Sequence, residues 1–320
     1  MSRFDEDVII VGSGFGGSVA ALRLVEKGYR VRVYEAGRRF EDDDFAKTNW
    51  NLRRYLWAPA LGCFGVQRLH RLPHVMILAG AGVGGGSLNY ANTLYQPGPA
   101  FFTDAQWAQI TDWQSELEPH YATAKRMLGV VDTYPHTGPI ERIMAGAAED
   151  LGVGETFRHA PVGVFLGTPG VRVPDPYFGG EGPDRTGCTL CGNCMVGCRV
   201  GAKNTLMKNY LPLAEQRGAV IEPLRTVTEV RQLPQGGFSV TTVRTGAWLR
   251  RDRRTVTAAQ VVLAAGTWGT QQLLHRMKHS GALPNVSDAL GRLTRTNSEA
   301  LDGAVAVRVP ESLELARGPA

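Results

Sequence analysis

Apolar residues recur along this chain with two different periods, and their order predicts the fold. Short apolar runs at 8–11 and 31–33 flank a segment in which Ala20, Ala21 and Leu24 share one helical face. This pattern predicts a strand, a helix and a second strand. Further apolar or alternating runs predict strands at 219–221, 227–230, 238–245 and 255–263, the last continuing as a buried parallel strand into the turn at 264–267.

This alternation is typical of an α/β fold. We expect a Rossmann-like, doubly wound parallel sheet assembled from distant segments of the chain, together with an antiparallel β-hairpin. A helix through 271–277 follows the last predicted strand, and Thr267 is its expected N-cap.

A region with a different pattern separates the two halves of this sheet. Residues 103–150 show helical spacing, with Thr103 and Ser115 as expected N-caps, whereas 160–187 is rich in glycine and proline without any period. Its apolar side chains would be poorly solvated in a free linker, so we expect a loop packed over a site. The predicted organisation is a first part of a ligand-binding domain at 1–95, an inserted covering region at 96–186, a second part at 187–300 and an atypical tail at 301–320.

The turn after the first predicted strand carries a dinucleotide-binding fingerprint. Gly12 permits a tight turn, Gly14 lets backbone N–H groups approach a pyrophosphate, and Gly17 lets the helix lie close to the strand. The free N–H groups and the dipole of the helix N-terminus favour a phosphate there. Glu35 ends the second strand, where a carboxylate can accept hydrogen bonds from ribose hydroxyls.

A second glycine cluster occupies 80–92. Glycines at this density do not sustain a helix or a central strand, because each loses backbone entropy and supplies no side chain to pack. Such a loop lets a ligand approach closely, and a flat aromatic ring or a second part of a phosphate chain is the natural candidate. An irregular connecting loop is the alternative. The polar side chains available in it are Ser87, Asn89 and Asn92.

Four of the five cysteines lie together, at Cys188, Cys191, Cys194 and Cys198. Their C-x2-C-x2-C-x3-C spacing is that of bacterial ferredoxins, whose thiolates hold an iron–sulfur cluster. Zinc binding, disulfides and plain structural cysteines are the alternatives. Arginine rather than proline follows Cys198, and a second C-x2-C unit across a longer spacer is missing. Structural cysteines in a tight turn are therefore favoured, and a metal site at these four positions is retained as a secondary hypothesis.

Composition excludes several classes of protein. The chain has 320 residues, of which 43% are hydrophobic and 20% charged, as in an ordinary soluble globular protein. Part of its net charge of +5 comes from the arginines at 250–254, which we expect in a solvated hairpin turn. Aromatic residues do not interleave them, which argues against nucleic-acid binding. We expect no membrane span and a cytoplasmic location, since the charged N-terminus enters the first strand directly and apolar runs are short.

These motifs together resemble the glucose–methanol–choline (GMC) family of flavin oxidoreductases, and most closely its cholesterol-oxidase-like bacterial branch. The resemblance runs from Val8 to about Glu299. It rests on the segment from Gly12 to Glu35, on 82–92, on 187–210 with its Gly-Ala-Lys-Asn-Thr core, and on 264–267. The first motif is common to many flavoproteins, whereas the middle two in this order are far more specific.

The resemblance implies bound FAD. Its ADP half would lie on Gly12, Gly14, Gly17 and Glu35, with the isoalloxazine ring near the second glycine loop. The positions that match the FAD contacts of that loop are Gly84, Gly85, Gly86, Asn89 and Asn92. Val227 matches the family position whose backbone meets the adenine, and a core valine is the alternative interpretation.

The resemblance also implies a reaction, the oxidation of an alcohol. A base removes the hydroxyl proton, hydride passes to the flavin, and oxygen or another acceptor regenerates the flavin. The implied substrate is a 3β-hydroxysterol such as cholesterol, and the ketone formed can isomerise.

The family's catalytic His and Asn would lie beyond residue 320, and none of the seven histidines here matches that motif. His275 and His279 are expected on a solvated helix face. We therefore read the chain as the N-terminal part of an enzyme, either a fragment or the product of a shifted reading frame. A flavin-binding remnant without turnover and an iron–sulfur electron-transfer protein are the alternatives.

Overall fold

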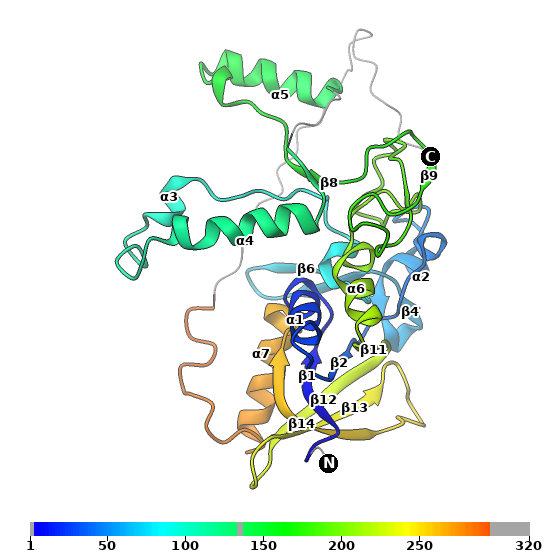
Figure 1. The fold of residues 1–320 in the computed structure, drawn as a ribbon, viewed down its shortest axis with the longest axis vertical. Helices are drawn as coiled ribbons and strands as arrows, with labels where there is room; N and C mark the ends of the chain where they lie inside the picture. Colours follow the sequence, from blue (N-terminus) through cyan, green and yellow to red (C-terminus); the bar gives the residue numbers. More distant parts are fainter. Residues whose placement is uncertain (1–2, 133–136, 295–320) are drawn as a thin grey trace. The chain divides into compact units, whose positions relative to one another are not determined.

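The computed structural model describes residues 3–132 and 137–294, and its internal contacts divide the chain into two compact units. The first unit consists of Met1–Asn92, Phe165–Thr189 and Asn193–Thr294; the second contains Thr93–Val164 and Leu190–Gly192. Figure 1 labels their helices and strands.

A six-stranded mixed sheet forms the centre of the first unit, in the order β11-β2-β1-β14-β13-β12. The first four strands in this order are parallel, and β13 pairs antiparallel with both β14 and β12. The α/β class, the parallel sheet built from distant segments and the antiparallel hairpin are all confirmed. The bounds are β1 Glu6–Val11, β2 Val31–Tyr34, β11 Val220–Glu222, β12 Arg225–Gln232, β13 Phe238–Arg244 and β14 Arg254–Leu263.

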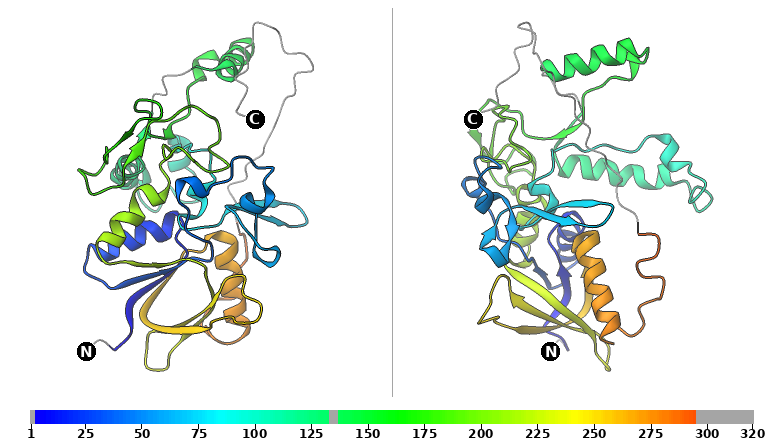
Figure 2. Two further views of the ribbon diagram at one scale, coloured as in Figure 1. Left: turned by 90° about the vertical axis from the view of Figure 1, so that its right-hand side faces the viewer. Right: turned by 180° about the vertical axis from the view of Figure 1, so that it is seen from behind.

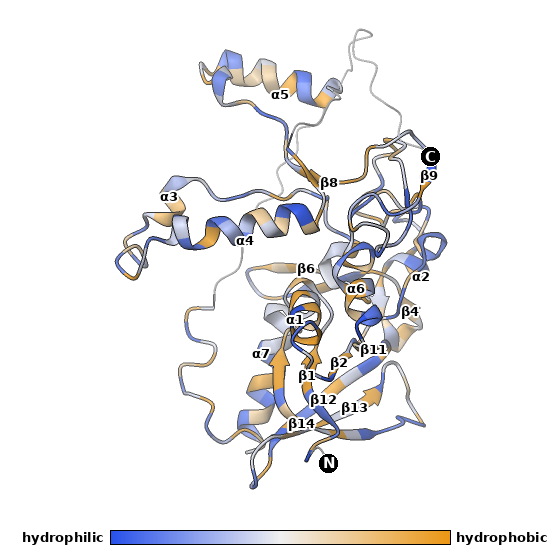
Figure 3. Cartoon of the chain, viewed as in Figure 1, coloured by the Kyte–Doolittle hydropathy of each residue, from blue (hydrophilic) through white to orange (hydrophobic). Residues whose placement is uncertain are grey.

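Helices cover both faces of this sheet (Figure 2). Helix α7, Gly266–His279, packs Leu273 and Met277 against Ile9 and Val11 of β1 in one hydrophobic cluster. Helices α1, Phe15–Val25, and α6, Tyr210–Gln216, lie together on the other side. Burial on both faces explains why β1 is a continuous apolar run, visible in Figure 3, rather than an alternating one.

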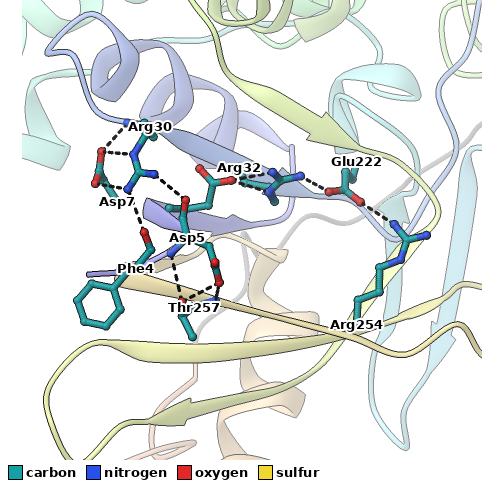
Figure 4. Close-up of polar contacts among 9 residues, drawn as sticks. Phe4, Asp5, Asp7, Arg30, Arg32, Glu222, Arg254 and Thr257 are labelled. Carbon is teal, nitrogen blue, oxygen red and sulfur yellow. Dashed lines mark hydrogen bonds and ion pairs between the residues drawn. The ribbon is translucent and has the colours of Figure 1, made fainter. Parts of the chain in front are cut away.

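Ion pairs and hydrogen bonds link neighbouring strands of the central sheet (Figure 4). Arg32 of β2 contacts Glu6 of β1 and Glu222 of β11, so one guanidinium links three neighbouring strands. At the start of β1 the carboxylate of Asp5 accepts hydrogen bonds from the backbone N–H and the hydroxyl of Thr257 in β14, at 2.9 and 2.7 Å. These contacts help to fix the register of the neighbouring strands.

Short elements complete the first unit. A two-stranded hairpin, β5 Gln67–Arg71 and β6 Met76–Gly80, leads directly into the second glycine loop. The loop contains the 3-10 turn η3, Gly85–Leu88. The others are η1 Asp42–Asp44, α2 Leu52–Tyr55, β3 Trp57–Ala58, η2 Pro59–Leu61, β4 Cys63–Phe64, β9 Arg172–Val173, β10 Arg185–Thr186 and η5 Leu206–Lys208.

The second unit is mainly helical, as its sequence pattern predicts. Its longest helix, α4, has Asp112 as its N-cap, because the Asp112 carboxylate accepts a hydrogen bond from the Ser115 N–H at 3.2 Å. The predicted caps Thr103 and Ser115 are wrong, since Thr103 ends α3 and Ser115 lies within α4. The elements are α3 Pro99–Phe102, α4 Trp113–Met127, β7 Val130–Val131, α5 Pro139–Asp150, η4 Gly154–Thr156 and β8 Val162–Gly163.

Two other expectations differ from the structure. Helix α7 begins two residues earlier than predicted, with Ala265 rather than Thr267 at the N-cap and without a side-chain cap. The segment Phe165–Thr189 belongs to the sheet-containing unit, so the inserted region ends at Val164 by its contacts and not at residue 186. The tail at 301–320 lies outside the described residues.

Within residues 3–132 and 137–294, the chain has no helix of the length and apolar character needed to cross a bilayer. The cytoplasmic location stays a prediction. The arginines at 250–253 lie exposed in the loop between β13 and β14, which confirms the predicted solvated hairpin.

Candidate flavin site

The β1–α1 turn has the backbone geometry that a phosphate site requires. Gly12 has a φ of +99°, and a Cβ on it would come within 2.5 Å of the Ala264 carbonyl oxygen. A Cβ on Gly17 would come within 2.0 Å of the Gly12 oxygen, so the helix packs against the strand only because both are glycines. Gly14 and Gly16 face open space, and no side chain caps α1 at Gly14. Backbone N–H groups at this helix start are therefore free to bind an anion.

Glu35 lies buried at the end of β2 and is held from two sides. Its carboxylate accepts hydrogen bonds from the Ser13 N–H at 3.0 Å, the Ser13 hydroxyl at 2.8 Å and the Gly37 N–H at 2.8 Å. A carboxylate has about four acceptor positions, so one remains for a ligand hydroxyl. This supports the predicted ribose contact.

The second glycine loop packs directly on the first motif. A Cβ on Gly85 would lie 2.7 Å from the Gly14 Cα, and the Gly84 N–H donates to the Ser13 hydroxyl at 3.1 Å. Gly86 faces open space. Two glycine motifs far apart in the sequence thus form one surface with little side-chain cover, as a flat cofactor requires.

The two predicted asparagines of this loop are both buried, and each has a partner. Asn89 donates from Nδ2 to Gln67 Oε1 of β5 at 2.9 Å. Asn92, with φ +56°, donates from Nδ2 to Cys194 Sγ at 3.3 Å. The structure therefore holds both side chains in fixed orientations beside the glycines.

The Gly-Ala-Lys-Asn-Thr segment lies beneath the loop and is almost wholly buried. The Lys203 ammonium donates to the carbonyl oxygens of Leu88 at 3.0 Å and Cys194 at 2.8 Å, and burial lowers its pKa to about 7. Ser87 donates to the Gly84 carbonyl at 2.8 Å and accepts from the Leu206 N–H at 3.0 Å. These bonds fix the loop from below.

Arg185 locks the same segment in place. Its guanidinium donates to the carbonyls of Gly201 at 3.1 Å and Ala202 at 2.7 Å and to the side chain of Asn204. Arg185 is 1% exposed. Part of the predicted loop at 160–187 is thus packed into the unit that contains the glycine motifs.

Strand β12 begins beside Glu35, since the Arg225 N–H donates to the Glu35 carbonyl oxygen at 2.8 Å. Val227 follows two residues later, at an irregularity in the β12–β13 register. Its side chain packs against the hydrophobic cluster of the sheet, as the core-valine interpretation requires. Its backbone lies near the ribose end of the site, so both interpretations stay open.

The cysteine run gives no support to a metal site. In the part of the chain that the structure describes, no group of three or more His, Cys, Asp or Glu side chains is arranged to hold a metal ion. None of the five cysteines, all of which lie in the described residues, forms a disulfide. Cys194 receives the bond from Asn92, and Cys198 Sγ accepts from the Lys203 N–H at 3.4 Å. The secondary hypothesis of a metal at Cys188, Cys191, Cys194 and Cys198 therefore gains nothing.

His275 and His279 are exposed on α7, as predicted. Sequence reasoning did not assign a role to three residues that organise the site, namely Ser13, Lys203 and Arg185. Ser13 occupies a variable position of the glycine fingerprint, and the other two donate to backbone carbonyls, which leave no pattern of side chains in the sequence. Only the burial of Lys203 and Arg185 distinguishes them from surface charges.

Comparisons with known proteins agree with this geometry. A family model described as GMC oxidoreductase matches residues 182–292, and one described as an NAD(P)-binding Rossmann-like domain matches residues 10–40. A Mycobacterium tuberculosis protein named cholesterol oxidase is 62% identical over 99% of this chain and 55% of its own length. One of the same name from Acinetobacter baumannii is 46% identical over 95% of this chain and 56% of its own length.

Among solved structures, pyridoxine 4-oxidase from Mesorbium loti superposes with a TM-score of 0.52 at 20% identity, covering 85% of this chain and 52% of that one. This likeness concerns the fold alone. The chain spans slightly more than half the length of the two curated relatives.

Proposed function

The chain belongs to the GMC oxidoreductase family, and from this premise we propose that it forms the FAD-binding part of an alcohol oxidase. One observation supports this most strongly. The Ser13 hydroxyl joins the Glu35 carboxylate to the Gly84 N–H, which brings the ribose-binding group and the second glycine loop to one place. FAD is the cofactor of this family, and the open backbone at Gly14 and Gly86 suits its extended form.

In this proposal Gly12, Gly14 and Gly17 shape the diphosphate site and Glu35 binds the ribose. Gly84, Gly85 and Gly86 provide the surface for the isoalloxazine, with Asn89 and Asn92 as hydrogen-bonding groups and Val227 at the adenine end. When bound, FAD supplies the hydride acceptor for oxidation of an alcohol. The residues of this chain bind and orient the cofactor and exclude water around it.

The proposed substrate is a 3β-hydroxysterol such as cholesterol, because the relatives that match nearly the whole chain carry the name cholesterol oxidase. Oxygen is the proposed acceptor, and isomerisation of the ketone is part of the same proposal. The base that accepts the hydroxyl proton is not assigned to a residue of this chain, since the resemblance puts it beyond residue 320.

Reconstitution with FAD followed by assay with cholesterol tests this proposal. The proposal predicts a yellow protein, and hydrogen peroxide released when cholesterol is added would extend oxidase activity to this chain by itself. A yellow protein that releases none would contradict oxidase activity for this chain and favour the flavin-binding remnant. Stoichiometric iron and sulfide in the purified protein would favour the electron-transfer alternative.

A further inference from the structure

Unpartnered polar atoms gather where strand β5 meets helix α7. In residues 3–132 and 137–294, the buried side-chain atoms that lack a hydrogen-bond partner include Arg68 Nε, His70 Nε2 and Trp268 Nε1. Arg68 and His70 leave the same face of β5, because strand residues two apart share a face. The rings of His70 and Trp268 lie 5.4 Å apart, so α7 contributes its indole to the same place.

Arg68 is the unusual member of this group. Its guanidinium lies 5.4 Å from the centre of the Trp57 ring, and no described carboxylate is within ion-pair distance of it. Burial lowers the pKa of Arg68. Because the Nε of this half-buried cation is buried without a hydrogen-bond partner, a bound anion would complete the site.

The position of Arg68 indicates which anion. Gln67, the residue before Arg68, accepts a hydrogen bond from Asn89 and so ties strand β5 to the glycine loop, while its side chain leaves the opposite face of the strand from Arg68. The Glu35 carboxylate is close enough to act on the charge of Arg68. Helix α7 starts directly after β14, beside Gly12, and has neither an acidic residue in its first turn nor a side-chain cap. Arg68 therefore lies at the carboxyl edge of the sheet, near the ribose end of the flavin site.

We propose that Arg68 and Trp268 form a phosphate subsite that holds the diphosphate of bound FAD. The inference rests on the proposed function, since it assumes that the site binds FAD. Arg68 Nε and Trp268 Nε1 are pure donors, and phosphate oxygens are pure acceptors. The flat guanidinium can donate two parallel hydrogen bonds to one phosphate, which a lysine cannot. Gln271 Oε1, also unpartnered, is an acceptor and has no role in this subsite.

Titration of the flavin-free chain with FAD, ADP and adenosine tests the subsite. Arg68→Met keeps an apolar stem against Trp57, and we expect it to weaken FAD and ADP about 10- to 100-fold, as for a lost charged hydrogen bond. Adenosine, which has no phosphate, should bind equally to both proteins. Trp268→Phe should weaken FAD and ADP by a smaller factor. Arg71→Met, an exposed site on the same hairpin, is the control and should change nothing.

Thermal unfolding of the flavin-free variants excludes a purely structural role. Arg68→Met removes an unpaired buried charge, so its melting temperature should stay unchanged or rise while FAD affinity falls. A lower melting temperature, or an equal loss of adenosine binding, would overturn the proposal. The proposal would also be overturned if Arg68→Met kept its affinity for FAD but lost binding of inorganic phosphate, because Arg68 would then form a site for free anions. Failure of the unaltered chain to bind FAD would instead contradict the proposed function.

Discussion

One hydroxyl group joins the two glycine motifs. Ser13 donates to Glu35 at 2.8 Å and accepts from the Gly84 N–H at 3.1 Å, and it is completely buried. Glu35 was identified from the sequence because its position after the second strand has a known chemical meaning. Ser13 could not be identified from the sequence, because its partner Gly84 is 71 residues away and only the fold brings the two together.

Replacing Glu35 tests its role at the ribose end. In Glu35→Gln an NH2 group replaces one carboxylate oxygen. In either orientation of the amide this NH2 group faces a backbone N–H donor, that of Ser13 or that of Gly37. We expect a loss of about 1–3 kcal/mol in unfolding free energy and at least about tenfold weaker FAD binding. Urea unfolding and flavin-fluorescence titration measure these effects. Glu26→Gln, exposed just after α1, is the control, and equal behaviour of the two variants would refute this role.

Lys203 predicts a pH dependence of stability. Burial lowers its pKa to about 7 in the folded chain, whereas the ordinary value is 10.5. Between these values the unfolded chain binds more protons, so the stability contributed by Lys203 rises with pH. Relative to Lys203→Met, the unaltered chain should therefore gain stability between about pH 7 and 10, with a constant difference below that range. Urea midpoints of both proteins across this range give the measurement, and a difference independent of pH would disprove the assignment.

At the scale of elements, the strand–helix–strand unit from β1 to β2 could be predicted because its spacing rules are local. The N-caps of α4 and α7 could not be predicted in this way. Asp112 and Ser115 lie three residues apart and are both residue types that commonly cap a helix, and α7 has no side-chain cap. The contacts of Arg185, next to the predicted end of the inserted region at residue 186, are a different case. Arg185 binds the carbonyls of Gly201 and Ala202, and contacts of this kind leave no periodic pattern in a sequence.

Adjacent glycines of α1 provide a matched test of the close packing between helix and strand. A Cβ on Gly17 would lie 2.0 Å from the Gly12 oxygen, whereas a Cβ on Gly16 meets no atom within 4 Å. Gly17→Ala should cost about 1–3 kcal/mol or more through overpacking. Gly16→Ala should be neutral or stabilise by up to about 1 kcal/mol, because alanine favours a helix. Thermal unfolding compares the two, and a Gly17→Ala variant as stable as Gly16→Ala would contradict this packing.

At the scale of the whole molecule, the sheet brings Gly12–Gly17, Glu35 and Gly84–Gly86 to one edge, although they come from separate parts of the chain. The resemblance to the GMC family could be recognised from motifs, and the 62% identity to a cholesterol oxidase agrees with it. The reacting groups of the oxidation could not be assigned in the same way. The chain spans slightly more than half of those relatives.

The central claim is that this chain by itself builds a specific FAD site. Its most direct test is a titration of the purified, flavin-free 320-residue chain with FAD, followed by flavin fluorescence and by the absorbance of the protein fraction after gel filtration. The account predicts saturable binding of one FAD per chain that excess NAD does not displace. Flavin that separates completely from the protein, or displacement by NAD at similar concentration, would contradict it.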